Sequence, residues 1–277
     1  IRATNHESRL RRVRRWAKRL AKRKDAMSDY GTISMDPRGE VVAGSAVTVT
    51  FTYTVGTLGV QPGGGLLIRT PNDGWDAPMA HRRQLPKRLE NQPFSMKDAE
   101  TCTINRCNLS ASATSREPNA GIELSVHNRV GPLSQFMKAT VCGGALAAGD
   151  VITLIYGDRS WGEDGAAVQK VAPTGDRFVA HVDVAGDGEF QPLDDAELDL
   201  TVRPGPVSRF NVVAPAIVKP GEPFELKVSG IDAYRNKPDA SWEGDVRLAC
   251  TDPHVSMPGS ASFAAGDDNR IAVQDVK

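Results

Sequence analysis

Short segments of alternating polarity, separated by turn-forming residues, limit this chain to a fold built from β-strands. The clearest is Val47–Val55, in which Val, Phe and Tyr alternate with Thr48, Thr50, Thr52 and Thr54. A period of two places one set of side chains in a core and the hydroxyl groups on the opposite face. With 26 Gly and 18 Pro in 277 residues, the segments between turns are short, which favours strands over helices. We therefore expect an all-β fold.

Six further candidate strands lie in residues 31–203, each bounded by Gly, Pro, Asn or Asp. They are Gly65–Thr70, Gly121–Asn128, Gln135–Val141, Asp150–Tyr156, Arg177–Val184 and Glu197–Val202. Seven strands are enough for an antiparallel β-sandwich, so we predict a first sandwich domain at 31–203. Between Pro71 and Ser115 the alternation fails, and we expect a long irregular excursion there. Loops on a rigid sheet often carry binding groups.

A second β-sandwich is expected at residues 204–277, after the linker Arg203-Pro204-Gly205-Pro206, because prolines interrupt strand pairing. Alternating runs follow at Val207–Val213, Glu222–Gly230 and Val246–Cys250. Their rhythm is typical of an immunoglobulin-like sandwich, which needs about 100 residues and seven strands. Only 74 residues follow Arg203, and Ile271–Lys277 has the pattern of a strand that is beginning. We therefore expect the second module to be incomplete.

Residues 1–30 form a basic head in front of an acidic body. The first 24 residues carry eleven Lys and Arg and one acid, Glu7, whereas the rest of the chain carries 23 bases and 33 acids. Apolar residues from Leu10 to Leu20 recur at helical spacing, so we predict a short basic amphipathic helix. Residues 9–24 could contact nucleic acid or an anionic membrane. A solvated extension is the preferred interpretation, because runs of charge are usually tails.

No motif for catalysis, for a cofactor or for a metal is found in the sequence. G-x-S-x-G, H-E-x-x-H, a Walker A lysine and a G-x-G-x-x-G that opens a helix are all missing. The four Cys form no C-x-x-C pair and the five His are scattered, which argues against a zinc site. Asp183, Asp187 and Glu189 are interpreted as an acidic hairpin turn, since their spacing is not that of a calcium loop.

Two features of the sequence bear on the compartment. No run of 18 or more apolar residues is present, so we expect no membrane span. The N-terminus lacks the apolar core of a secretory signal, which favours the cytoplasm.

Cations next to aromatic residues are the candidate groups for binding a small molecule. One set is Arg69, Trp75 and His81, in and beside the irregular stretch, and the other is Arg159 and Trp161 in a later loop. A planar aromatic ring beside a cation can hold a ring or an acid. That both Trp fill the core or a loop is the preferred interpretation, because Trp is commonly half-buried.

Two stretches resemble a known bacterial family. Gly149–Ser160, followed by Gly165 and Val168-Gln169, resembles the "GD-x-I-x-x-x-x-GD-x-S" segment of the family named domain of unknown function 3604. Three later segments resemble the module that follows it in that family, in the same order and spacing: Arg203–Val207, Pro220–Phe224 and Asp232–Asn236. The resemblance covers residues 40 to 277.

In that family, the sandwiches precede a larger catalytic domain that looks like a metal-dependent hydrolase of the polymerase-and-histidinol-phosphatase type. The resemblance therefore implies a non-catalytic accessory or scaffolding portion, whose partner is the downstream catalytic domain. A divalent metal would belong to that domain, and no catalytic residue or cofactor is expected in this chain. Two alternatives are a free-standing immunoglobulin-like binding or adhesion protein and a tether led by the basic helix.

Overall fold

The computed structural model describes residues 29–71, 74–80, 107–127, 135–160, 162–193 and 198–277. Over these residues the chain is all-β and its named strands pair in antiparallel sheets, which confirms the predicted fold class. The basic helix predicted within residues 1–30 lies outside the described residues. The chain divides into two compact units. The first takes in Ile1–Gly39, Ala46–Ala167 and Asp176–Leu200, and the second takes in Glu40–Ser45, Val168–Gly175 and Thr201–Lys277.

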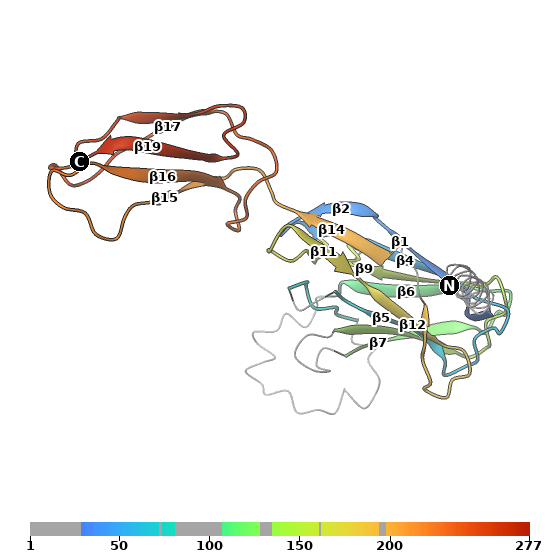
Figure 1. Cartoon of the computed structure of the whole chain (residues 1–277). Coiled ribbons are helices and arrows are strands. Elements are labelled where there is room, and N and C mark those ends of the chain that lie inside the picture. Colours follow the sequence, from blue (N-terminus) through green and yellow to red (C-terminus); the bar gives the residue numbers. More distant parts are fainter. Residues whose placement is uncertain (1–28, 72–73, 81–106, 128–134, 161, 194–197) are drawn as a thin grey trace, which may run out of the picture. The chain divides into compact units, whose positions relative to one another are not determined.

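The first unit is a β-sandwich of two main sheets (Figure 1). One sheet has the order β1-β4-β9-β6, with β1 at Thr32–Asp36, β4 at Val49–Thr54, β9 at Val151–Tyr156 and β6 at Leu109–Thr114. The other has the order β13-β12-β5-β8-β7, with β13 at Gln191–Leu193, β12 at Val179–Asp183, β5 at Gly65–Arg69, β8 at Phe136–Cys142 and β7 at Gly121–His127.

Two smaller sheets complete the strand list before residue 204. One pairs β3 (Ala46–Val47) with β10 (Ala166–Ala167). The other has the order β11-β14-β2, with β11 at Thr174–Arg177, β14 at Asp199–Arg203 and β2 at Gly39–Val42.

All seven strands predicted for residues 31–203 are present, but the expectation that residues 71 to 115 are irregular throughout was wrong at β6. This strand pairs with β9 in unbroken register from Leu109↔Tyr156 to Thr114↔Val151. Its sequence, LSASAT, has only Ser and Ala between its two end residues, and these small residues have little preference for strands. The partner strand therefore determines its conformation, and that information is not local.

The aromatic core of the first unit is built around Phe178, which is fully buried. Its ring makes edge-on contacts with Phe51, Trp75 and Tyr156, at centroid distances of 5.1, 5.3 and 6.4 Å. Phe51 belongs to β4 and Tyr156 to β9, whereas Phe178 immediately precedes β12 of the other main sheet. The Phe178 ring therefore helps to hold the two sheets of the sandwich together.

The second unit is a smaller β-sandwich. A three-stranded sheet has the order β15-β16-β19, with β15 at Arg209–Val213, β16 at Phe224–Ile231 and β19 at Arg270–Val276. A two-stranded sheet pairs β17 (Gly244–Arg247) with β18 (Ser260–Phe263). Leu226, Val228, Phe263, Val273 and Val276 form its buried core.

We predict that Phe178→Ala will lower the free energy of unfolding of the first unit by about 3–5 kcal/mol, because it removes a large buried ring and leaves a cavity. Urea unfolding followed through the amide NMR signals of the first unit measures this. Leu58→Ala is the control, since Leu58 is 52% exposed, and its cost should stay within about 0.5 kcal/mol. Equal small losses in the two variants would contradict the assigned core.

Candidate functional site

Trp75, one of the predicted ligand-binding residues, lies in the core of the first unit. It is 2% exposed, and its Nε1 donates a hydrogen bond of 2.6 Å to Oδ2 of Asp176. Asp176 is itself buried, so this hydrogen bond gives a partner both to the buried N–H of Trp75 and to the buried carboxylate of Asp176. In the structure the indole fills space between the sheets, and its face is not presented at the surface.

Arg69 lies on β5, on the face opposite to the buried side chain of Ile68. Its cross-strand neighbour is Val179, and two residues further along β12 is His181. Burial lowers the pKa of His181, and the positive charge of Arg69 lowers it further. In the described part of the chain, Nε of Arg69 and Nδ1 of His181 are buried without a hydrogen-bond partner. His181 was not among the predicted site residues, because only the strand register places it near Arg69.

Arg159 lies in the exposed turn that follows β9. Asp158 shapes this turn by accepting a 2.8 Å hydrogen bond from the backbone N–H of Ser160. The other two predicted residues, His81 and Trp161, lie outside the described residues. No hydrogen bond, ion pair or ring contact joins Arg69, Trp75 and Arg159 to one another among the residues that the structure describes.

Buried carboxylates in the first unit brace turns. Asp183, which is fully buried at the end of β12, accepts hydrogen bonds from the backbone N–H groups of Ala185, Gly186 and Gly188. This confirms the acidic hairpin turn predicted there. At Asp158, burial acts to raise the pKa, but hydrogen bonds from Ser110 and Ser160 outweigh burial and lower it. These acids are used to fix loop geometry.

The loop Asp232–Asn236 of the second unit is organised by the carboxylate of Asp232, which is 1% exposed. Its Oδ1 accepts hydrogen bonds from the backbone N–H groups of Tyr234 and Asn236, both at 2.8 Å. Its Oδ2 accepts from the N–H of Gly205 at 3.1 Å and from Nδ2 of Asn236 at 2.8 Å. One carboxylate therefore fixes its own loop and the proline-rich segment around Gly205.

The same loop holds two segments of the second unit that are distant in sequence. Asn236 accepts a hydrogen bond from the N–H of Ala172 and donates one to the carbonyl of Lys170. The ring of Tyr234 packs over Gly44, where a Cβ atom would lie 2.0 Å from the ring. Gly44 has φ +68°, so its conformation and the close approach of the ring both require glycine.

The pKa of Asp232 is lowered in the folded chain. Burial acts to raise it, but the hydrogen bonds donated by Asn236, Gly205 and Tyr234 favour the ionised form and outweigh burial. The carboxylate is therefore charged at neutral pH, and it acts as a fixed acceptor for four donors.

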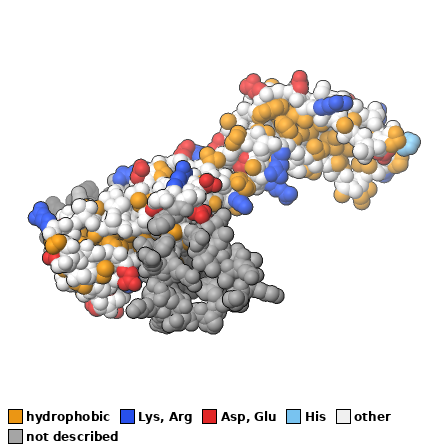
Figure 2. Space-filling model, turned by 180° about the vertical axis from the view of Figure 1, so that it is seen from behind, with side chains coloured by type: hydrophobic (Ala, Val, Ile, Leu, Met, Phe, Trp, Pro, Cys, Tyr) orange, Lys and Arg blue, Asp and Glu red, His pale blue; other side chains and the backbone are white. Residues whose placement is uncertain are grey.

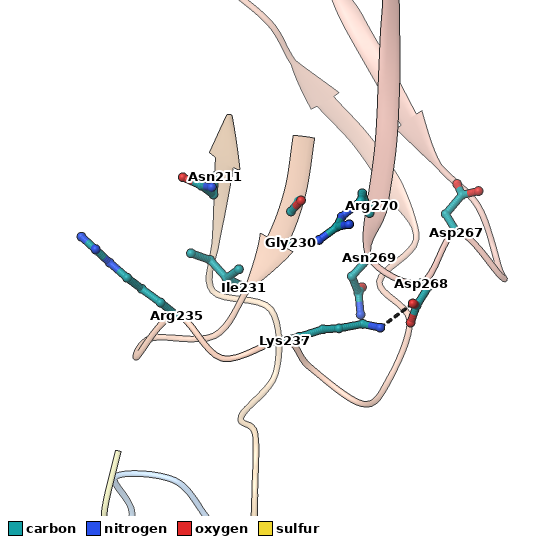
Figure 3. A pocket seen from close by; sticks show the side chains of 10 residues that line it. Asn211, Gly230, Ile231, Arg235, Lys237, Asp267, Asp268, Asn269 and Arg270 are labelled. Atoms are coloured by element: carbon teal, nitrogen blue, oxygen red, sulfur yellow. Dashed lines mark hydrogen bonds and ion pairs between the residues drawn. The ribbon is translucent and has the colours of Figure 1, made fainter. Parts of the chain in front are cut away.

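A polar cleft of about 460 Å³ lies beside this loop, at one end of the three-stranded sheet (Figure 3). Its cations are Arg235 from the loop, Lys237 directly after the loop and Arg270 from β19, and its acids are Asp267 and Asp268. Lys237 forms an ion pair with Asp268. None of these residues was predicted to bind a ligand, because the loop and the start of β19 are brought together only by strand pairing.

Asn269 fixes the wall of the cleft that is formed by the turn before β19. It is 3% exposed and accepts a 2.7 Å hydrogen bond from the N–H of Trp242. Its Nδ2 donates to the carbonyls of Pro238 and Ala240, at 3.2 and 2.9 Å. The amide side chain therefore connects the turn to the segment after Lys237.

The second unit also has an uncovered apolar edge, made of Val212 and Val213 on β15 and of Ile217 and Val218 after it. These side chains are 52%, 51%, 88% and 48% exposed. Val212 lies directly across from Val228, so the two side chains share a face of the sheet, yet Val228 is fully buried. The core face thus continues onto β15 without a cover among the described residues, and hydrophobic side chains gather on this unit in Figure 2.

Groups typical of a metal centre or a membrane span are not found where the structure can be described. Within the described ranges no three His, Cys, Asp or Glu side chains are grouped so that they could hold a metal ion. None of the helices in that part of the chain is long and apolar enough to cross a membrane.

No protein-family model and no curated protein matches the chain. Among solved structures, one described as AvmM, which catalyzes macrocyclization in alchivemycin A biosynthesis, is similar with 8% sequence identity and a TM-score of 0.30. The match covers 65% of this chain and 92% of that one. A likeness of this degree carries no inference about this chain.

We predict that Asp232→Asn will lower the free energy of unfolding of the second unit at pH 7 by about 1–3 kcal/mol, because an amide nitrogen would replace an oxygen that accepts two hydrogen bonds. The folded pKa is lowered, so the stabilisation by Asp232 is present above the pKa of the unfolded chain. It is lost as the pH falls through the folded pKa. The difference between variant and wild type should therefore shrink as the pH falls below the unfolded pKa of 3.8 and through the lower folded pKa.

Urea unfolding at a series of pH values, followed through amide NMR signals of the second unit, checks this. Asp245→Asn is the matched control, because Asp245 is exposed and its bond from Ser262 can persist to an amide oxygen. A loss of stability at Asp232→Asn that did not change with pH would contradict the role of the charge.

Proposed function

We propose that this chain is a non-catalytic accessory and scaffolding portion of a larger, metal-dependent hydrolase, and that its second unit docks on the downstream catalytic domain. The uncovered apolar edge carries the docking part of the proposal. Exposed apolar groups that continue a core face are typical of surfaces that another domain covers. Covering Ile217 alone would contribute about 2 kcal/mol, on the basis of its apolar area.

The exposed edge of the sheet supports docking as well. β15 lies at one end of the β15-β16-β19 order, so one side of its backbone has no neighbouring strand in the described sheet. An edge strand that combines free backbone groups with exposed Val side chains promotes association unless another element covers it. A neighbouring domain of the same protein would provide such a cover.

The hydrolase part of the proposal is supported by the family resemblance at Gly149–Ser160 and at the loop Asp232–Asn236. The divalent metal and the catalytic residues would then belong to the downstream domain. The buried acids of this chain are consistent with a supporting role, because Asp183 and Asp232 hold backbone N–H groups of turns.

We predict that the double variant Val212→Ser, Ile217→Ser will reduce self-association of the isolated chain, because it removes apolar surface from the uncovered edge. Its free energy of unfolding should change by less than about 1 kcal/mol, since both side chains are exposed. Light scattering over a concentration series measures the association. Val171→Ser is the control, because Val171 is 66% exposed but lies outside the edge.

A fall of several kcal/mol in the free energy of unfolding would show that Val212 and Ile217 belong to the packed core, and it would contradict the docking surface.

The hydrolase part is tested separately by reading the coding sequence beyond Lys277. A continuation into His- and Asp-rich segments is expected, and a stop codon there would overturn the hydrolase part alone.

A further inference from the structure

We propose that the polar cleft of the second unit binds a small molecule through an anionic oxygen group, a carboxylate or a phosphate. The main contacts would come from Arg270, Ser229 and Asn211, with Arg235 at the rim. This site is separate from the apolar edge, and the proposal does not depend on a downstream hydrolase.

The three main residues form a row across neighbouring strands. Asn211 on β15 is directly across from Ser229 on β16, and Ser229 is directly across from Arg270 on β19. Residues that oppose one another in antiparallel strands place their side chains on the same face, about 5 Å apart. The row therefore offers an amide, a hydroxyl and a guanidinium group on one face, and Figure 3 shows the Arg270 side chain directed toward Gly230 of β16.

The charge of the cleft favours an anion. Lys237 neutralises Asp268, and the carboxylate of Asp267 accepts a 2.7 Å hydrogen bond from the N–H of Ala264 in its own turn. Arg235 and Arg270 form no ion pair with any residue that the structure describes. Three cations against two acids leave the cleft with a net charge of +1. A guanidinium group can hold a carboxylate or a phosphate through two parallel hydrogen bonds.

The loops that line the cleft are fixed before any ligand arrives. Arg235 adopts φ +74°, a left-handed conformation that costs a residue with a side chain about 1–2 kcal/mol. The hydrogen bonds of Asp232 on both sides of Arg235 hold this conformation. Asn269 likewise holds the turn on the opposite side, with φ +57°. A pre-formed site loses less conformational entropy on binding.

The size of the cleft is that of a site for a small molecule. A volume of about 460 Å³ falls within the range of about 300–1,000 Å³ that is common for such sites. It leaves room for an uncharged body attached to the anionic group.

The test is an NMR titration of the whole chain with inorganic phosphate and, separately, with acetate, at constant ionic strength. We expect saturable shifts of the amide signals of Ser229 and Arg270 with at least one probe, with a Kd of about 1–10 mM. Shifts with phosphate alone indicate a phosphate ligand, and shifts with acetate alone indicate a carboxylate. Saturation by both indicates a site for either group.

Arg270→Gln should weaken the binding at least about fivefold, and Arg270→Lys should weaken it less, because the charge remains while the paired donors are lost. Arg247→Gln is the matched control, since Arg247 is an exposed cation on β17 outside the cleft, and it should change Kd by less than about twofold. An unchanged amide spectrum verifies that each variant is folded. The absence of saturable shifts with both probes, or equal weakening by Arg270→Gln and Arg247→Gln, would overturn the proposal.

Discussion

The second unit depends on the hydrogen bonds that the buried carboxylate of Asp232 accepts. Burying an ionised group is unfavourable unless its hydrogen-bonding capacity is used, and four donors use both oxygens here. Through Asn236 and Tyr234, the same loop holds residues 168–175 and 40–45, which are far from it in sequence. The loop also places Arg235, and Lys237 directly after it, in the lining of the cleft. Removing this one charge should therefore affect both the packing of the unit and the shape of its cleft.

Much of the fold could be predicted from the sequence, because strand formation has a local signature. At Val49–Thr54 every second side chain is buried and the intervening threonines are not, as the alternation requires. β9 and β16 show the same pattern. The acidic turn after β12 was also predictable, because an Asp followed by small residues and glycines can hydrogen-bond its own turn.

What could not be predicted depends on contacts between distant residues. Between Leu109 and Thr114, β6 holds only Ser and Ala, and it gains its strand geometry from pairing with β9. The row Asn211, Ser229 and Arg270 exists only through two strand registers, so no spacing along the sequence indicates it. The segments 40–45 and 168–175 belong to the second unit although each is flanked by residues of the first. The sequence around Trp75 likewise contains no sign that Asp176 is its hydrogen-bond partner.

The second unit thus combines two surfaces of different chemistry. One is the apolar edge along β15, and the other is the cleft at the end of the sheet that β15 shares with β16 and β19. β15 contributes to both, because Asn211 lines the cleft and Val212, the next residue, points to the opposite face. Within β15, Val212 of the edge and Asn211 of the cleft therefore lie on opposite faces, whereas Val213 of the edge shares the face of Asn211.

The most direct measurement is amide hydrogen exchange of Gly205, Tyr234 and Asn236, in the wild type and in Asp232→Ala. If Asp232 organises the unit, all three amides exchange slowly in the wild type and lose their protection together in the variant, while the core amide of Val228 stays protected. Unchanged protection of Gly205 in Asp232→Ala would show that the proline-rich segment is held by other contacts, and it would contradict the central role given to this carboxylate.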